Sequence, residues 1–202
     1  VEVAVENFAG HKLPTAYPSR RSWIYFSVTD RNGDTVFESG AFNPDGSIKG
    51  NENDMDAASY EPHYLEVDSD EEVQIYEVIM AAPDDSVTTG LLEAVRYLKD
   101  NRLLPRGFSK EDAEPDIAVR GGALEDGDFE ASGDRLTYLV DVGSAEGPFN
   151  VRAELWYQSI GFRWARNLLE EDAPEIDRFV AYYEQMSEDT PAILARDSME
   201  SR

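Results

Sequence analysis

The two histidines of the chain, His11 and His63, are the side chains most suited to bind a metal through nitrogen. A neutral imidazole offers one lone pair to a metal. His11 stands in a loop that also holds Pro14 and Pro18, and these prolines restrict the backbone. The loop is therefore expected to hold one shape. A catalytic zinc site is not indicated, because the chain has neither a third histidine nor a His-Glu-x-x-His sequence.

Oxygen donors gather in the polar segment 42–62. A loop of about 20 residues inside a compact domain suggests a function or a bound ion. Calcium prefers carboxylate and amide oxygens, although the spacing here does not match an EF-hand loop. A solvated loop is the competing interpretation, since chance clusters are expected among 42 acidic residues. The candidate calcium ligands are Asn43, Asp45, Asn51, Asn53 and Asp54.

Four arginines near aromatic residues form a third set of candidates. Their guanidinium groups could bind carboxylates of a partner through bidentate hydrogen bonds. The competing interpretation is that they neutralise acidic groups of this chain. The four are Arg20, Arg21, Arg163 and Arg166.

The chain has no cysteine, which excludes disulfides, thiolate metal sites and cysteine nucleophiles. Covalent haem attachment within the chain is excluded too, because it needs a Cys-x-x-Cys-His sequence. No Gly-x-Ser-x-Gly sequence and no phosphate-binding Gly-x-x-x-x-Gly-Lys sequence is present. These motifs therefore do not identify an enzyme, and a hydrolase that lacks them stays an alternative.

The net charge is −24, from 42 acidic and 18 basic residues, and it argues against nucleic acid and anionic membranes as partners. Only 4 of the 18 basic residues are lysines, a pattern typical of proteins from saline habitats or GC-rich genomes. No apolar run reaches the roughly 18 residues that a membrane span needs. The first residue, Val1, is not Met and suggests a mature or excised segment.

Alternating apolar residues, many of them β-branched or aromatic, predict a series of strands. Asn32-Gly33 indicates the turn of a hairpin. Residues 91–98 fit either a short helix or a strand that ends near Lys99. The expected strands are 1–5, 23–28, 35–38, 73–80, 117–120, 135–142 and 149–159.

Helical spacing of apolar residues replaces this alternation after Gly161. It predicts helices over 163–171 and 174–186, and a last short helix over 191–199. Strands followed by helices indicate a mainly β fold, an antiparallel β-sandwich with C-terminal α-helices. We expect one domain over 1–202, with the sandwich at about 1–160 and a helical appendage at about 161–202.

Residues 10–21 read Gly-His-Lys-Leu-Pro-Thr-Ala-Tyr-Pro-Ser-Arg-Arg. The run resembles a segment in the haem-free, β-rich C-terminal region of multihaem c-type cytochromes. Residues 61–64, 73–77, 97–108 and 153–165 are similar to further segments of that family, in the same order. Ala16 is a departure, because the family usually has glycine there and alanine tolerates a positive φ poorly.

The resemblance implies a haem-free module that packs on a haem-bearing segment or subunit. Its haem c would lie in that partner, and the location would be periplasmic or extracellular. His11 or His63 would be candidate axial ligands, and the four arginines would contact haem propionates or partner carboxylates. The alternative is an extracellular calcium- or carbohydrate-binding β-sandwich module.

Overall fold

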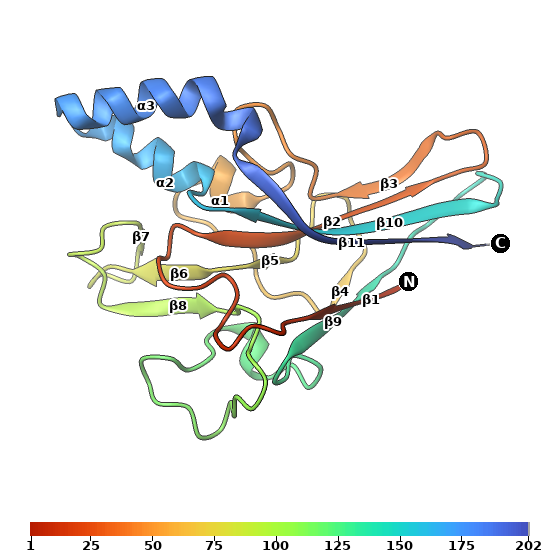
Figure 1. Cartoon of the computed structure of the whole chain (residues 1–202), viewed down its shortest axis with the longest axis horizontal. Helices are drawn as coiled ribbons and strands as arrows, with labels where there is room; N and C mark the ends of the chain where they lie inside the picture. Colours follow the sequence, from red (N-terminus) through yellow and green to blue (C-terminus); the bar gives the residue numbers. More distant parts are fainter. Residues whose placement is uncertain (202) are drawn as a thin grey trace.

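The longest strands pair in one antiparallel sheet in the computed structural model, which describes residues 1–201 (Figure 1). Its strand order is β11-β10-β2-β3, and β5 also pairs with β2. The strands are β2 (Arg21–Thr29), β3 (Thr35–Ser39), β5 (Ile75–Tyr76), β10 (Phe149–Gln158) and β11 (Pro191–Ser201). The Asn32-Gly33 hairpin is confirmed, because β2 and β3 pair antiparallel across that turn.

Two three-stranded sheets complete the β structure, in the orders β1-β9-β4 and β7-β6-β8. All pairs in them are antiparallel except β4 with β9. The mainly β, antiparallel, sandwich-like fold with C-terminal helices is thus confirmed. The strands are β1 (Glu2–Glu6), β4 (Glu66–Val67), β6 (Val78–Ala81), β7 (Val87–Thr88), β8 (Arg96–Asp100) and β9 (Gly133–Tyr138).

Strand β2 lies at the centre of the core, since apolar side chains cover both of its faces. On one face Phe26 stacks on Tyr138 of β9, with ring centroids 3.9 Å apart. On the other face Trp23 packs with Ile48 and Ile75. Burial on both faces explains why the sequence of β2 is almost continuously apolar and aromatic.

The single strand predicted over 73–80 is wrong in detail, because it divides at Glu77 into β5 and β6. The Glu77 N–H donates to Asn101 Oδ1 at 3.0 Å, and its carboxylate accepts from Lys99. These contacts replace ladder hydrogen bonds where the chain passes from the main sheet to the β7-β6-β8 sheet. Sequence periodicity does not show such a change of sheet.

Three further predictions are corrected at the edges of sheets. Residues 117–120 form no strand, and only Arg120 makes an isolated bridge, with Asp100. The ambiguous segment 91–98 contributes strand β8, which begins at Arg96. The strand predicted over 135–142 is β9 and ends at Tyr138.

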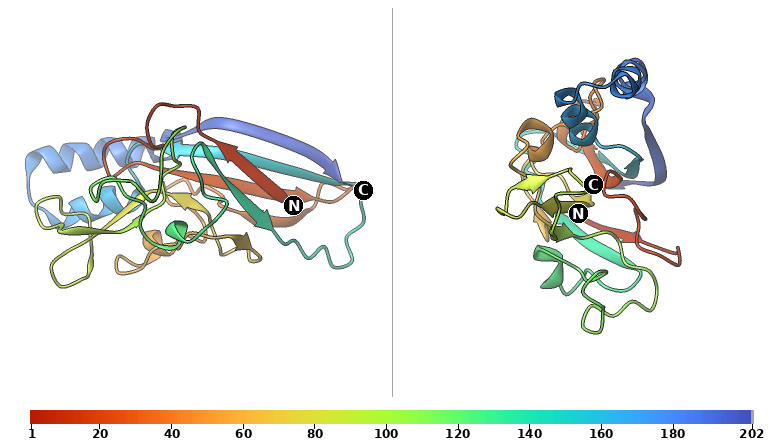
Figure 2. Two further views of the ribbon diagram at one scale, coloured as in Figure 1. Left: turned by 90° about the horizontal axis from the view of Figure 1, so that it is seen from below. Right: turned by 90° about the vertical axis from the view of Figure 1, so that its left-hand side faces the viewer.

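Helix α3 (Pro174–Met186) has the predicted bounds, with Pro174 in its first turn. The helix predicted over 163–171 is α2 (Phe162–Asn167) followed by a 3-10 turn, and α1 (Glu52–Met55) is one turn inside segment 42–62. Figures 1 and 2 show α2 and α3 at one end of the molecule and the C-terminus at the other. Among residues 1–201, no helix has the length and apolarity to cross a membrane.

The helix predicted over 191–199 is wrong, because this segment is strand β11 and pairs antiparallel with β10 along its whole length. A short isolated helix is marginal in water. The edge of β10 offers the same backbone a full ladder of hydrogen bonds. Tertiary pairing therefore decides this segment, and the predicted helical appendage ends with a strand of the main sheet.

Candidate functional site

Backbone contacts fix the loop between β1 and β2, residues 7–20, which we call the His11 loop. Asn7 Nδ2 donates to the carbonyl oxygens of His11 and Leu103 at 2.9 and 3.0 Å. Leu13 and Leu103 exchange two backbone hydrogen bonds of 2.9 and 2.8 Å. These contacts tie the loop to the segment after β8 and favour a single shape.

Ala16 has a φ of +62°, in the left-handed region. The family that the sequence resembles usually has glycine at this position. The backbone conformation that favours glycine is therefore present here although the residue is alanine. A non-glycine residue in this region costs roughly 1 kcal/mol.

The His11 imidazole is exposed, and its two nitrogens differ. Nδ1 lies 2.9 Å from the Lys12 carbonyl oxygen, which only accepts, so Nδ1 carries the proton and donates. Nε2 then bears the lone pair and contacts no protein donor within residues 1–201. A histidine that ligates a metal typically donates its other N–H to a carbonyl or carboxylate in this way. This arrangement leaves Nε2 as the nitrogen through which His11 could bind a metal.

His63 is buried, and both of its nitrogens are engaged. Nδ1 accepts from Gln74 Nε2 at 2.9 Å and from Asn101 Nδ2 at 3.1 Å. The amide oxygens of Gln74 and Asn101 accept backbone N–H groups, which fixes the orientation of both amides. Nε2 therefore carries the proton and donates to Asp126 Oδ2 at 2.9 Å. No lone pair of His63 is available to an external metal.

His63, Asp126 and Asp134 form a buried polar cluster, with candidate ligand atoms within 4.8 Å of one another. Burial lowers the pKa of His63 and raises that of Asp134. Tyr76 donates to Asp134 Oδ2 at 2.7 Å, and Asp134 Oδ1 has no partner within residues 1–201. Because Nε2–H, not a lone pair, faces Asp126, the cluster does not fit a cation. It is a structural polar core.

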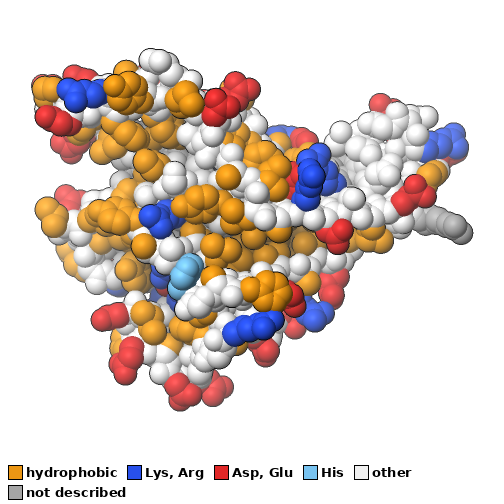
Figure 3. Space-filling view, viewed as in Figure 1, with side chains coloured by type: hydrophobic (Ala, Val, Ile, Leu, Met, Phe, Trp, Pro, Cys, Tyr) orange, Lys and Arg blue, Asp and Glu red, His pale blue; other side chains and the backbone are white. Residues whose placement is uncertain are grey.

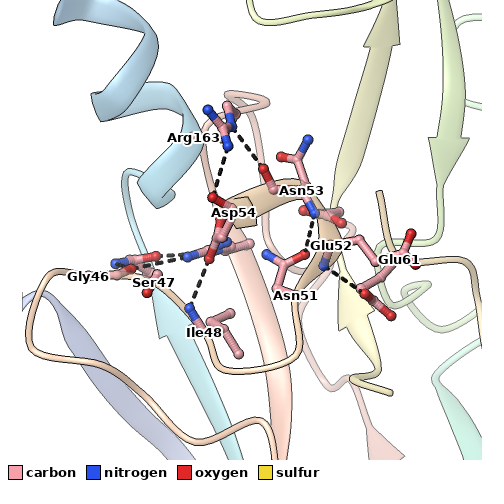
Figure 4. Close-up of polar contacts among 12 residues, drawn as sticks. Gly46, Ser47, Ile48, Asn51, Glu52, Asn53, Asp54, Glu61 and Arg163 are labelled. Carbon is pink, nitrogen blue, oxygen red and sulfur yellow. Dashed lines mark hydrogen bonds and ion pairs between the residues drawn. The ribbon is translucent and has the colours of Figure 1, made fainter. Parts of the chain in front are cut away.

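Arg21, at the start of β2, holds the loop after β3 against the main sheet. Its Nη1 donates to Asp54 Oδ1 at 2.7 Å, and its Nε donates to Gln158 Oε1 at 2.8 Å. Both charged side chains of this ion pair are at most 5% exposed. Asp54 Oδ2 also accepts the Ile48 N–H at 2.8 Å (Figure 4). The Arg21 guanidinium is therefore buried and bound to groups of this chain.

The other three predicted arginines differ in the number of hydrogen bonds that their side chains make within the chain. Arg163 reaches from α2 to the carbonyl oxygens of Asn53 and Asp54, both at 2.8 Å (Figure 4). Arg20 Nη1 donates to Thr15 O at 3.1 Å within the His11 loop. Arg166 is exposed on α2, and it is the one of the four whose side chain makes no hydrogen bond within residues 1–201.

The five predicted calcium ligands all make hydrogen bonds with other groups of the chain, and Asp45, Asn51 and Asp54 do so through their oxygens. Asp45 accepts from the Ser47 N–H and hydroxyl, and Asn51 caps α1. Asn53 donates to Ser59 O at 2.7 Å. Asn43 donates to Ser47 Oγ at 3.0 Å, and Asp54 is paired with Arg21. The segment is thus built from turns and a short helix.

Sequence analysis missed a buried ionic group beside the His11 loop, which we call the Asp100 node. Lys12 Nζ donates to Asp100 Oδ2 at 2.9 Å, and Arg102 contacts both carboxylate oxygens at 2.7 and 2.9 Å. Arg120 exchanges two backbone hydrogen bonds with Asp100, each 3.2 Å. Burial lowers the pKa of Lys12, and the positive charges of Arg102 and Arg120 lower it further. The carboxylate of Asp100 partly offsets these effects by raising the pKa of Lys12. Lys12 and Asp100 are 88 positions apart, so no argument from local spacing could find the pair.

No protein-family model matches the chain, and no curated protein matches its sequence. Its structure is similar to that of a penta-haem cytochrome c552 from Thermochromatium tepidum, with a TM-score of 0.54 and 14% sequence identity. The match covers 99% of this chain and 35% of that cytochrome, so the chain spans about a third of its length. The fold is therefore one found within a multihaem cytochrome.

Proposed function

We propose that this chain is a non-catalytic, haem-free module of a multihaem cytochrome electron-transfer system. It packs on a haem-bearing segment or subunit, and His11 supplies an axial ligand to one haem of that partner. The observation that carries the proposal is the His11 imidazole, with Nδ1–H held by a backbone carbonyl and Nε2 exposed. The similarity in fold to part of a penta-haem cytochrome supports the same conclusion.

The residues around His11 fit this role. The carbonyl of Lys12 fixes the ring orientation and increases the basicity of Nε2, which strengthens a bond to iron. Leu103 and Asn7 hold the loop, so little conformational entropy is lost when a partner binds. The haem, when bound, supplies the redox chemistry, since this chain has no cysteine to attach one.

A surface suited to packing is also present. Figure 3 shows hydrophobic side chains gathered over one face, with acidic side chains mainly along the rim. Phe8 and Tyr17 of the His11 loop are large apolar side chains with exposed fractions of 66% and 55%. Exposed apolar side chains of this size beside a candidate ligand favour a protein partner.

The test uses a ferric haem c peptide that has one histidine ligand and one open axial position. The full chain should convert this haem to the low-spin bis-histidine form, seen as a shift of the Soret band. His11→Ala should abolish the shift, and His11→Gln serves as a polar variant of similar size. An absent shift with the wild-type chain, or an equal shift with His11→Ala, would overturn the proposal.

We further propose a periplasmic or extracellular location, by relation to multihaem c-type cytochromes. Cell fractionation tests the location.

We also propose that the protein is adapted to salt. This proposal rests on the net charge of −24, because salt screens repulsion among like charges. The free energy of unfolding should therefore rise with sodium chloride concentration in urea titrations. A flat or falling dependence would argue against salt adaptation.

The calcium- or carbohydrate-binding alternative is weaker, because Asp45 and Asp54 already bind groups of this chain. A rise in melting temperature on adding calcium would support it. Trp23 is buried in the core, which removes one of the aromatic side chains that a sugar-stacking face would use.

A further inference from the structure

A cleft of about 820 Å³ borders the His11 loop, and we call it the Arg120 cleft. Pro18 of the His11 loop forms one wall, and β8 with the segment before it forms another. The segment 115–121 closes the third side and brings Arg120 to the cleft. The backbone bridge between Arg120 and Asp100 joins the cleft to the Asp100 node, and through it to Lys12 beside His11.

Apolar side chains form about half of the lining, and polar groups form the rest. Leu91 and Val95 line the cleft with exposed fractions of 45% and 61%, and Met80 and Leu98 contribute further apolar surface. Ile117, next to the lining residue Asp116, is 50% exposed. An apolar surface of this kind favours a flat, weakly hydrated ligand or partner.

The lining carries two arginines, Arg96 and Arg120, and one carboxylate, Asp116. The neighbouring Asp100 node adds the cations of Lys12 and Arg102 around the Asp100 carboxylate, in a chain of net charge −24. The guanidinium of Arg120 makes one hydrogen bond, from Nη2 to Pro115 O at 3.1 Å. Its remaining N–H donors have no acceptor within residues 1–201. Arg96, also in the lining, is paired with Asp85 at 2.7 Å.

We propose that the Arg120 cleft receives the propionate-bearing edge of the haem that His11 ligates, with Arg120 donating hydrogen bonds to a propionate. The inference rests on the function proposed above and names the surface that recognises the haem. The apolar part of the lining suits the macrocycle edge, and the free guanidinium donors suit a carboxylate. Of the four predicted propionate contacts, Arg21 and Arg163 bind other groups of the chain, and Arg20 donates to Thr15 O. The exposed Arg166 lies on α2 and does not line this cleft, whereas Arg120 does.

The experiment compares the ferric haem c peptide with the same peptide after its propionates are esterified. Wild-type chain should bind the free-propionate form about tenfold more tightly than the ester, the effect expected of one charge-assisted hydrogen bond. The Arg120→Gln variant should lose this preference. It should bind the free-propionate peptide and the ester with the affinity that the wild type has for the ester. Arg120→Lys should restore part of it, because the charge remains.

Arg178→Gln is the matched control, because it removes the same charge from the exposed surface of α3. It should keep the wild-type preference, and urea titrations verify that each variant is folded. A Soret shift that depends on His11 but is insensitive to esterification and to Arg120→Gln would overturn this inference alone. Absence of any shift with the wild-type chain would overturn the proposed function as well.

Discussion

The two histidines have the same side chain and opposite chemical availability. His11 lies on the surface, with Nδ1–H held by one carbonyl and Nε2 free. His63 is buried, with three hydrogen-bond partners on its two nitrogens. The difference shows that a histidine stays available when one nitrogen has no protein partner, and becomes structural when both nitrogens are hydrogen-bonded.

The largest effect expected from this comparison is on stability. His63→Ala would leave Asp126, Gln74 and Asn101 with unmatched buried hydrogen-bonding groups, and it would create a cavity. We expect a loss of about 3 kcal/mol in the free energy of unfolding, typical of such changes. Urea titration followed by circular dichroism measures it. His11→Ala should cost less than about 0.5 kcal/mol, since surface substitutions rarely cost more. If His63→Ala and His11→Ala lowered the free energy of unfolding equally, the distinction between a structural and an available histidine would be wrong.

The two lysine ion pairs extend the comparison from hydrogen bonds to charges. Lys12 is paired with the fully buried Asp100, whereas Lys49 lies 3.8 Å from Asp70 with both side chains more than half exposed. Lys12→Met should lower the free energy of unfolding by about 2 kcal/mol, less than the loss of a sole partner because Arg102 remains. Lys49→Met, the matched control, should change it by less than about 0.5 kcal/mol. Chemical denaturation of both variants decides this prediction, and equal effects would count against a structural Asp100 node.

The pH dependence of stability gives a smaller effect. Burial lowers the pKa of His63 in the folded state, so the unfolded chain takes up that proton first as the pH falls. The free energy of unfolding should therefore decrease as the pH falls below about 6.5, the ordinary pKa of histidine. Burial raises the pKa of Asp134, so the folded chain protonates this carboxylate first as the pH falls. Its titration therefore increases the free energy of unfolding with falling pH, opposite to the effect of His63.

The difference between wild type and His63→Gln isolates the histidine from Asp134. Urea midpoints at pH 7.5 and 5.5 should move further apart for the wild type than for the variant. If the variant shows the same change with pH as the wild type, titration of His63 does not contribute.

The smallest expected effect lies in the His11 loop itself. Ala16→Gly removes the steric cost of a φ of +62° and should raise the free energy of unfolding by about 0.5 kcal/mol, after the greater entropy of glycine in the unfolded chain is allowed for. A thermal melt measures this, and binding of the haem c peptide should be unchanged. A lower melting temperature would show that the loop does not carry this strain.

Much of the fold could be predicted from local pattern. Strand β2 follows from its β-branched and aromatic residues, the Asn32-Gly33 turn from turn chemistry, and helix α3 from helical spacing. All three are properties of residues close together in the chain. The failures lie where distant segments compete for the backbone. β11 pairs with β10 instead of forming a helix, and Glu77 divides one apolar run between two sheets.

The candidate site could be predicted only in part. Sequence singled out His11 and the prolines of its loop, and it also kept His63 and Arg21 as candidates. Only the structure shows that Arg21 is bound to Asp54 and His63 to Asp126. Those pairings join residues 33 and 63 positions apart, and no local pattern encodes them.

The sequence by itself determined the composition of the chain, its acidity, its lack of covalent haem attachment and its succession of local elements, because each depends on residue type or on near neighbours. Tertiary structure decided which side chains remain available. It exposed Nε2 of His11, engaged both nitrogens of His63, and placed Lys12, Arg102 and Arg120 around Asp100. The physical reason is that burial and hydrogen-bond partners are set by contacts between segments far apart in the chain.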